Sequence, residues 1–287
     1  MSHWAHDRLL FKVRAGSRAH GLATPNSDED SRGVCVPPKR YLLGLSAFEQ
    51  WESEGGDHVV FGLQKFVRLA LDGNPNIIET LFTRPEDQLF VHPLSRELLD
   101  RRDLFLSRKV GFKFGRYAIH QLQKIERHHR WLTTEPPIKP QPQHFGAQLG
   151  ENSPKFPDTA SEKAFRAAVK HHRSYQAWRK NRNPKRAELE KRYGYDTKHA
   201  MHLCRLLKMG CEILELGEVR VFRPDGDWLR SVREGSLSYH ALLDWVREME
   251  QKLSLLEKQS SLPEEPDFSE AEQMVVRITE DYLSLPE

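Results

Sequence analysis

A short turn with glycine at both ends, Gly16-Ser-Arg-Ala-His-Gly21, precedes two closely spaced aspartates, Asp28 and Asp30. The glycines let backbone N–H groups approach an anion closely, and Ser17 adds a hydroxyl. Residues two apart on an extended strand point to the same side, so both carboxylates can share one hard, oxygen-preferring cation such as Mg²⁺. This pattern predicts a strand–turn–strand unit that binds a metal-bound nucleoside triphosphate.

Apolar segments on either side of this motif indicate the strands that carry it. Residues 8–14 predict a strand entering the turn, and residues 33–36 predict a strand that two prolines end. Residues 57–61 form another short strand-like run, with Asp57 at its start. A third carboxylate is needed because two metal ions clamp the attacking and leaving oxygens of an in-line phosphoryl transfer. Asp57 is our candidate.

Two alternatives to these assignments stay open on the residues alone. Residues 26–30 also fit a polar surface turn, since Asn, Ser and Asp dominate such turns. For the third carboxylate, Glu54 and Glu52 are alternatives to Asp57.

Three longer blocks extend the pattern well beyond the turn. They are Ser27-Asp-Glu-Asp-Ser-Arg-Gly33, Gly73-Asn-Pro-Asn-Ile-Ile-Glu79 and Gly194-Tyr-Asp-Thr-Lys-His-Ala-Met-His-Leu-Cys-Arg205. With the Gly-Ser turn, they resemble the predicted nucleotidyltransferase family of the DNA polymerase beta superfamily that is associated with RNA repair pathways. The blocks span roughly the first three quarters of the chain, so the resemblance is more specific than a Gly-Ser turn alone.

The resemblance implies a role for each residue of the motif. Gly16 and Ser17 would hold the triphosphate, and Asp28 and Asp30 would bind Mg²⁺ or Mn²⁺. Asp57 would complete the catalytic and metal-binding carboxylates and help to activate the attacking hydroxyl. The implied reaction transfers a nucleoside monophosphate from an NTP to a hydroxyl and releases pyrophosphate. An RNA end is the preferred acceptor.

A helix expected over residues 196–214 carries a candidate phosphate clamp. Lys198, His202 and Arg205 recur at helical spacing on the side opposite to an apolar face. Because Arg binds phosphate bidentately and Lys acts as a point charge, this side suits the phosphates of a nucleotide. A stripe that merely faces solvent is the alternative.

Residues 163–192 form the chain's densest basic region, interleaved with Phe165, Tyr175 and Trp178. Basic groups neutralise phosphates and aromatic rings stack on bases, so this composition suits a single-stranded polynucleotide. A charged helical surface whose aromatic side chains belong to the core is an equal alternative.

The order of expected elements predicts an α+β fold with a small mixed β-sheet nucleotidyltransferase core flanked by helices, plus a mostly helical C-terminal lobe. We expect the core over residues 1–105 and the nucleotide- and substrate-binding lobe over 106–260, with a Pro-rich loop at 133–160. Residues 261–287 would form a linker and a terminal helix.

Details of the later chain give three further expectations. Residues 218–222 alternate as a strand, and the acidic terminal helix is expected to pack on the basic lobe. Glu79 could face the site, but a surface acid near a helix start is the preferred interpretation.

Composition narrows the function classes without choosing among them. The net charge of +3 is too small to require nucleic acid. The cysteines, Cys35, Cys204 and Cys211, lie in apolar contexts without metal spacing and predict buried thiols. Neither a signal peptide nor a long apolar run appears, so we expect a cytoplasmic protein without a membrane partner.

Two other functions remain open. A protein-modifying nucleotidyltransferase would use the same site on a Ser, Thr or Tyr hydroxyl. A non-catalytic RNA-binding or antitoxin-like partner would need only the basic surface, and the Asp pair disfavours it. The motifs do not specify the nucleotide, template use or oligomeric state.

Overall fold

The computed structural model describes residues 3–150 and 153–286, which form two compact units. The first unit contains the chain up to residue 121 and from residue 200 onward, and the second contains residues 122–199. This division differs from the expected boundaries at 105 and 260. The reason is that α6 (Arg108–Thr133) and α9 (Thr197–Leu216) run through the unit boundaries as continuous helices, without a linker that composition would reveal.

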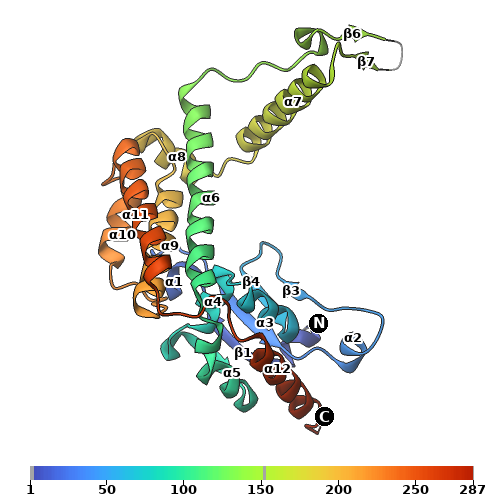
Figure 1. The fold of residues 1–287 in the computed structure, drawn as a ribbon, viewed down its shortest axis with the longest axis vertical. Coiled ribbons are helices and arrows are strands. Elements are labelled where there is room, and N and C mark those ends of the chain that lie inside the picture. Colours follow the sequence, from blue (N-terminus) through green and yellow to red (C-terminus); the bar gives the residue numbers. More distant parts are fainter. Residues whose placement is uncertain (1–2, 151–152, 287) are drawn as a thin grey trace. The chain divides into compact units, whose positions relative to one another are not determined.

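A five-stranded mixed sheet lies at the centre of the first unit (Figure 1). Its strands are β1 (Leu9–Arg14), β2 (Ser31–Cys35), β3 (Gln50–Glu52), β4 (His58–Gly62) and β5 (Gln88–Val91). They lie in the order β3-β4-β2-β1-β5. Only β2 and β4 pair in parallel; the other neighbours are antiparallel. Helices surround this sheet, so the expected α+β class is confirmed.

The two faces of the sheet are buried by different parts of the chain. Neighbouring residues of a strand point to opposite faces, and Val60 and Phe61 illustrate this on β4. Val60 belongs to a cluster with Ala5 and Cys35, against which Trp4, Leu9, Phe48 and Trp51 pack. Phe61 lies near Phe66 of α3 (Leu63–Leu71), whose ring also meets Phe11 of β1 edge-on at 5.6 Å. Apolar residues therefore anchor both sides of the strands that carry the motif.

Helix α4 (Pro75–Leu81) begins after a capping asparagine. The Asn74 side chain accepts a hydrogen bond from the N–H of Asn76, and Pro75 occupies the first turn, where its missing N–H costs nothing. Ile77, Ile78 and Leu81 of this helix are buried.

The remaining helices of the first unit are short or C-terminal. They are α1 (Gly16–Ala19), α2 (Lys39–Leu42), α5 (Arg96–Asp100), α10 (Gly226–Arg233), α11 (Tyr239–Gln259) and α12 (Phe268–Leu283), with 3₁₀ turns at Trp4–His6, Pro85–Asp87, Pro93–Ser95 and Arg102–Phe105. Helix α12 packs on α3, and Arg277 pairs with Glu97 at 2.6 Å. The expectation that this terminal helix packs on the basic lobe is therefore wrong.

Helix α9 is buried on nearly all sides within the first unit. The apolar face of Ala200, Leu203, Leu207, Cys211 and Leu214 is buried, and so are Met201, Cys204, Leu206 and Met209, which lie outside that face. Gly111 of α6 permits a close crossing, because a Cβ there would overlap the side chain of Leu214. On the predicted polar side, Arg205 is thus internal, while Lys198 and His202 are half-buried.

Residues 218–222 do not form the predicted strand. Val221 is buried, and the N–H of Arg223 donates to the carbonyl of His20 at 3.1 Å. Arg223 also pairs with Glu212 and Asp225, at 2.7 and 2.9 Å. Individual hydrogen bonds and ion pairs to nearby segments replace the hydrogen-bond ladder of a β-strand. The alternation of apolar and polar residues alone therefore misidentified this segment.

The second unit contains α7 (Thr159–Lys180), α8 (Pro184–Tyr193) and parts of α6 and α9. The expected Pro-rich loop carries a 3₁₀ turn at Pro142–Phe145 and a two-stranded sheet of β6 (Gln148–Leu149) and β7 (Pro154–Lys155); its residues 151–152 lie outside the described ones. Tyr175 and Trp131 are buried against each other, 5.8 Å apart, and Trp178 lies 5.2 Å from Trp131. Of the three aromatic side chains named in the basic region, Tyr175 is therefore core, while Phe165 and Trp178 stay partly exposed.

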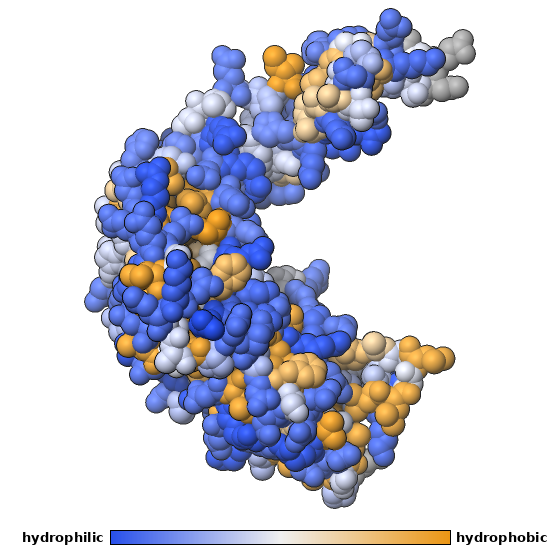
Figure 2. All heavy atoms as spheres, in the orientation of Figure 1, coloured by the Kyte–Doolittle hydropathy of each residue, from blue (hydrophilic) through white to orange (hydrophobic). Residues whose placement is uncertain are grey.

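Apolar side chains gather on the surface over α2 and the loop that follows it (Figure 2). Leu43 and Leu45 are strongly exposed there. This surface follows the C-terminal end of β2, opposite to the end that Asp30 precedes, so it is separate from the candidate site. None of the helices formed by residues 3–150 and 153–286 has the length and apolar composition needed to cross a bilayer.

Candidate active site

The strand pairing brings the predicted motif residues to one end of the sheet. Arg14, the last residue of β1, pairs with Ser31, the first of β2, which pairs in turn with His58 at the start of β4. The Gly16-Ser17 turn follows β1, Asp28 and Asp30 precede β2, and Asp57 precedes β4. All five residues therefore flank the same sheet end, although the aspartates lie just before their strands and not within them.

Gly16 and Asp30 are in direct contact. The N–H of Ala15 donates to the backbone carbonyl of Asp30 at 2.9 Å, which continues the pairing of the two strands past their ends. Gly16 has a φ of 62°, a conformation that residues with a Cβ rarely adopt. A Cβ at this position would collide with the carboxylate of Asp30. Glycine is therefore required here both by the backbone and by the adjacent acid.

The turn itself coils into the short helix α1. The first N–H groups of a helix have no acceptor within it, so those near Gly16 and Ser17 are available to an anion. Ser17 is half-exposed, and its carbonyl accepts the N–H of Leu22 at 2.8 Å. This hydrogen bond closes the turn, and the Ser17 hydroxyl forms no hydrogen bond with another described residue.

Arg18 ties the aspartate-bearing loop to the turn. Its guanidinium donates to the backbone carbonyls of Ser27, at 3.2 Å, and Asp28, at 3.4 Å. It also lies 3.7 Å from the carboxylate of Glu29. Arg18 thus fixes the backbone around Asp28 while leaving the Asp28 carboxylate exposed.

Asp57 is held next to the aspartate pair through its backbone. The N–H of Ser31 donates to its carbonyl at 2.9 Å, and the guanidinium of Arg32 donates to the same oxygen at 2.8 Å. The Asp57 side chain is exposed. Glu52, one alternative third carboxylate, accepts a hydrogen bond from Gln50 at 3.1 Å and is less available.

The donor set fits a hard divalent cation. In the described chain, the carboxylates of Asp28, Asp30 and Asp57 form no hydrogen bond or ion pair with another side chain. No group of three His, Cys, Asp or Glu side chains among the described residues converges closely enough to enclose a metal ion. Mg²⁺ usually takes one or two carboxylates together with substrate phosphates and water, so it does not need such a cage.

Behind the turn, a connected series of buried polar contacts links three elements. Arg205 of α9 pairs with Glu79 of α4, and the other Glu79 oxygen lies 3.4 Å from Nε2 of His20, which follows α1. The Nδ1 of His20 lies 3.2 Å from the carbonyl of Val221. Burial, followed by the charge of Arg205, holds the pKa of His20 well below its ordinary value of 6.5. A neutral imidazole therefore supports the end of α1.

These buried polar contacts correct two expectations. Glu79 is buried and is not a surface acid. Arg205 is only 5 % exposed and already has a carboxylate partner, so it does not face a cleft as part of a phosphate clamp. Lys198, in the second unit, and His202, in the first, are half-buried, and their role in binding phosphate stays a prediction.

The sequence reasoning missed Arg18, Arg32 and the pairing of His20 with Glu79. Arg18 lies inside the Gly-rich turn, and its positive charge close to Asp28 in sequence could have indicated its contact with the aspartate-bearing loop. No local sequence pattern indicated the contacts of Arg32 and His20. Their partners lie 25 and 59 residues away along the chain and come close only in the folded protein.

Comparisons with known proteins agree with this geometry. The family model described as "RNA repair pathway DNA polymerase beta family" matches residues 2–277. An uncharacterized 38.9 kDa protein from the nrdC-mobD intergenic region of Enterobacteria phage T4 is 33% identical over 90 residues. That match covers 28% of this chain and only 27% of the phage protein. No solved structure matches. The family model spans nearly the whole chain, so the protein belongs to the RNA repair pathway DNA polymerase beta family, which indicates a nucleotidyltransferase role in RNA repair.

Proposed function

We propose that the protein is a Mg²⁺- or Mn²⁺-dependent nucleotidyltransferase that transfers a nucleoside monophosphate from an NTP to a hydroxyl at an RNA end. The observation that carries this proposal is the contact between Gly16 and Asp30 at the sheet end shared with Asp57. It joins the proposed anion-binding turn to carboxylates that have no side-chain partner among the described residues. The family assignment supports the reaction class and the link to RNA repair.

In the proposed reaction, the turn binds the triphosphate. Backbone N–H groups near Gly16 and the hydroxyl of Ser17 donate to phosphate oxygens. Asp28 and Asp30 would hold the metal, which when bound neutralises charge on the phosphates. Arg18 and Arg32 keep the two carboxylate-bearing segments in place through the backbone contacts described above.

The chemical step is an in-line substitution at the α-phosphorus. The acceptor hydroxyl oxygen forms a bond to phosphorus while the bond to the bridging oxygen of the pyrophosphate breaks. The hydroxyl proton passes to the carboxylate of Asp57, and pyrophosphate leaves with the bond electrons. Positioning and electrostatic stabilisation supply most of the catalysis in such transfers.

The test uses each α-labelled NTP with Mg²⁺ or Mn²⁺ and a panel of RNA, DNA and protein acceptors. We expect label on RNA with wild-type protein, and a loss of about 10³-fold in Asp28→Ala and Asp30→Ala, the range seen when a key electrostatic group is removed. Glu29→Ala is the matched control, because Glu29 lies between the two aspartates and is exposed. It should retain activity.

Each outcome bears on a separate part of the proposal. Full activity in both aspartate variants would refute the site, and label on protein would replace the RNA acceptor with a protein hydroxyl. An RNA strand whose end lacks both the 2′- and 3′-hydroxyls should take no label. Circular dichroism on every variant establishes that it is folded.

The third carboxylate is tested separately. Asp57→Asn should lower the transfer rate about 10²- to 10⁴-fold, the usual contribution of a general base, while nucleotide binding persists. Glu52→Gln and Glu54→Gln are the controls. A larger loss in either control than in Asp57→Asn would move the role to that glutamate.

A further inference from the structure

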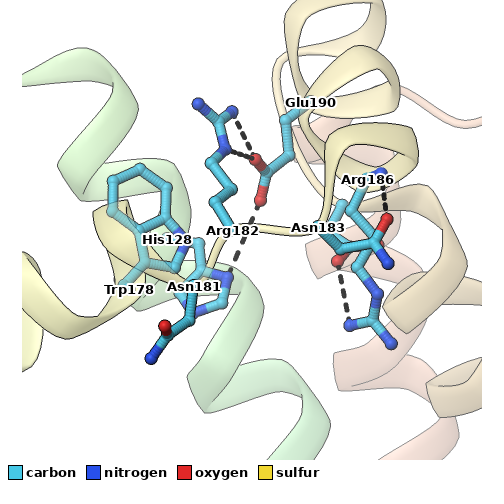
Figure 3. Close-up of a pocket in the computed structure, with 8 residues that line it drawn as sticks. His128, Trp178, Asn181, Arg182, Asn183, Arg186 and Glu190 are labelled. Atoms are coloured by element: carbon cyan, nitrogen blue, oxygen red, sulfur yellow. Dashed lines mark hydrogen bonds and ion pairs between the residues drawn. The ribbon is translucent and has the colours of Figure 1, made fainter.

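A pocket of about 280 Å³ lies in the second unit where α7 ends and α8 begins (Figure 3). Its lining residues are His128, Trp178, Asn181, Arg182, Asn183, Arg186, Glu190 and Asp196. Sites for drug-sized ligands usually measure roughly 300–1,000 Å³, so this pocket suits one small ring system. None of these residues belongs to the candidate active site.

The charges inside the pocket cancel. Arg182 donates to Glu190 at 2.7 Å, and Arg186 lies 3.4 Å from Asp196. Both carboxylate side chains are at most 2 % exposed. Although burial opposes ionisation, the hydrogen bonds and charge of His199 and the charge of Arg186 lower the pKa of Asp196 to about 2. The interior therefore presents two neutralised ion pairs and favours an uncharged ligand.

Planar groups and free amides line the same space. The Arg182 guanidinium lies 4.9 Å from the centre of the Trp178 ring, and Figure 3 shows His128 beside that ring. The Asn181 side chain forms no hydrogen bond within the described chain. Asn183 caps α8 through its oxygen, which accepts the N–H of Arg186 at 3.3 Å, and its NH₂ group has no acceptor among the described residues. Bases stack on aromatic rings and guanidinium planes, and amides bind their edges.

Basic residues flank the lining residues of the pocket along the chain. Arg179, Lys180 and Lys185 flank the lining residues in sequence and are exposed. Within the described chain they form no ion pair. Unpaired basic side chains around a neutral pocket attract a polyanion whose backbone stays outside while an uncharged part enters.

We propose that this pocket receives one unpaired base of an RNA strand, between Arg182 and the amides of Asn181 and Asn183, while flanking phosphates contact the surrounding basic residues. The proposal rests on the proposed function, because it identifies how the RNA acceptor is held. It selects a base within a strand over a free nucleotide, since the basic residues outside match a continuous backbone.

The experiment measures binding of full-length protein to a labelled single-stranded RNA of about 10 nucleotides, a length within the range of single-strand binding sites. Binding is followed by fluorescence anisotropy in EDTA without NTP. A strand of equal length with abasic riboses is the second probe. The test variant is Asn181→Ala/Asn183→Ser, in which serine preserves the helix cap. Lys180→Ala/Lys185→Ala is the control for the basic surroundings.

We expect the asparagine variant to bind RNA about 5- to 150-fold more weakly, the range of discrimination that a good amide–base contact provides. Its affinity for the abasic strand should equal that of wild type. The lysine variant should weaken binding of both strands and reduce the salt slope by about 1.4, the value for two phosphate contacts to a single strand. In wild type, 2-aminopurine in the RNA should change its fluorescence on binding.

Unchanged RNA affinity in the asparagine variant, or an equal loss for the abasic strand, would overturn the pocket assignment. Competition by free nucleoside monophosphates as strong as that by the RNA strand would overturn the choice of a strand. These results are distinct from failure of the proposed function. If the wild-type protein binds no RNA, the proposal that RNA is the acceptor fails. If the protein binds RNA but transfers no nucleotide, the binding result still stands.

Discussion

Replacing Gly16 with alanine tests the contact that joins the turn to Asp30. Alanine at a φ of 62° pays about 1–2 kcal/mol for the left-handed conformation. The new Cβ would also overlap the Asp30 carboxylate, and moving that side chain off its rotamer costs about 0.5–1.5 kcal/mol more. We therefore expect Gly16→Ala to destabilise the first unit by about 2 kcal/mol and to displace a proposed metal ligand.

Gly194→Ala provides a matched control for the backbone cost. Gly194 also has a positive φ, of 81°, but nothing lies within 4 Å of the position that a Cβ would occupy. The free energies of unfolding are measured by urea titration followed by circular dichroism. Gly194→Ala should lose about 1 kcal/mol less than Gly16→Ala, because it lacks the cost of displacing a side chain. It should retain nucleotidyl transfer.

A double-mutant cycle isolates the side-chain contact. In an Asp30→Ala background, Gly16→Ala should cost less than in wild type, because the carboxylate that it would strike is gone. Equal costs in the two backgrounds, or a Gly16→Ala protein with wild-type transfer activity, would refute the reasoning.

Two further predictions concern the buried polar contacts behind the turn. Glu79→Gln should lower the free energy of unfolding by about 3–5 kcal/mol in urea titrations, because it leaves the charge of Arg205 buried without its partner. Adding Arg205→Met should recover part of that loss, and no recovery would contradict the pairing. His20 has a lowered pKa in the folded protein, so the unfolded chain binds the extra proton first as pH falls below about 6.5. Stability should therefore fall below that pH, by up to about 1.4 kcal/mol per pH unit, and His20→Gln should flatten this dependence; an unchanged slope in that variant would contradict a buried neutral imidazole.

Much of the local structure follows from short sequence patterns. The Asn74-Pro75 pair sets the start of α4, and the apolar runs identify β1 and β4, because capping and strand alternation act between near neighbours. The Gly16-Ser17 turn and the Asp28-x-Asp30 spacing likewise mark the candidate site without any knowledge of the fold. The three cysteines are free and buried, as their apolar contexts predict.

Contacts between distant residues were decided only by the tertiary structure. Arg205 carries the same charge whether its helix faces solvent or lies inside the protein. Its burial follows from the packing of α4 and α6 on α9 and from the carboxylate that Glu79 provides. The alternating residues 218–222 join no strand, and Val221 and Arg223 contact His20 instead. The sequence alone predicts which residues carry the proposed chemistry, because residue type and local spacing set hydrogen-bonding capacity and charge. The tertiary structure decided which of those charges are neutralised by burial and pairing, because that depends on partners brought together from far along the chain.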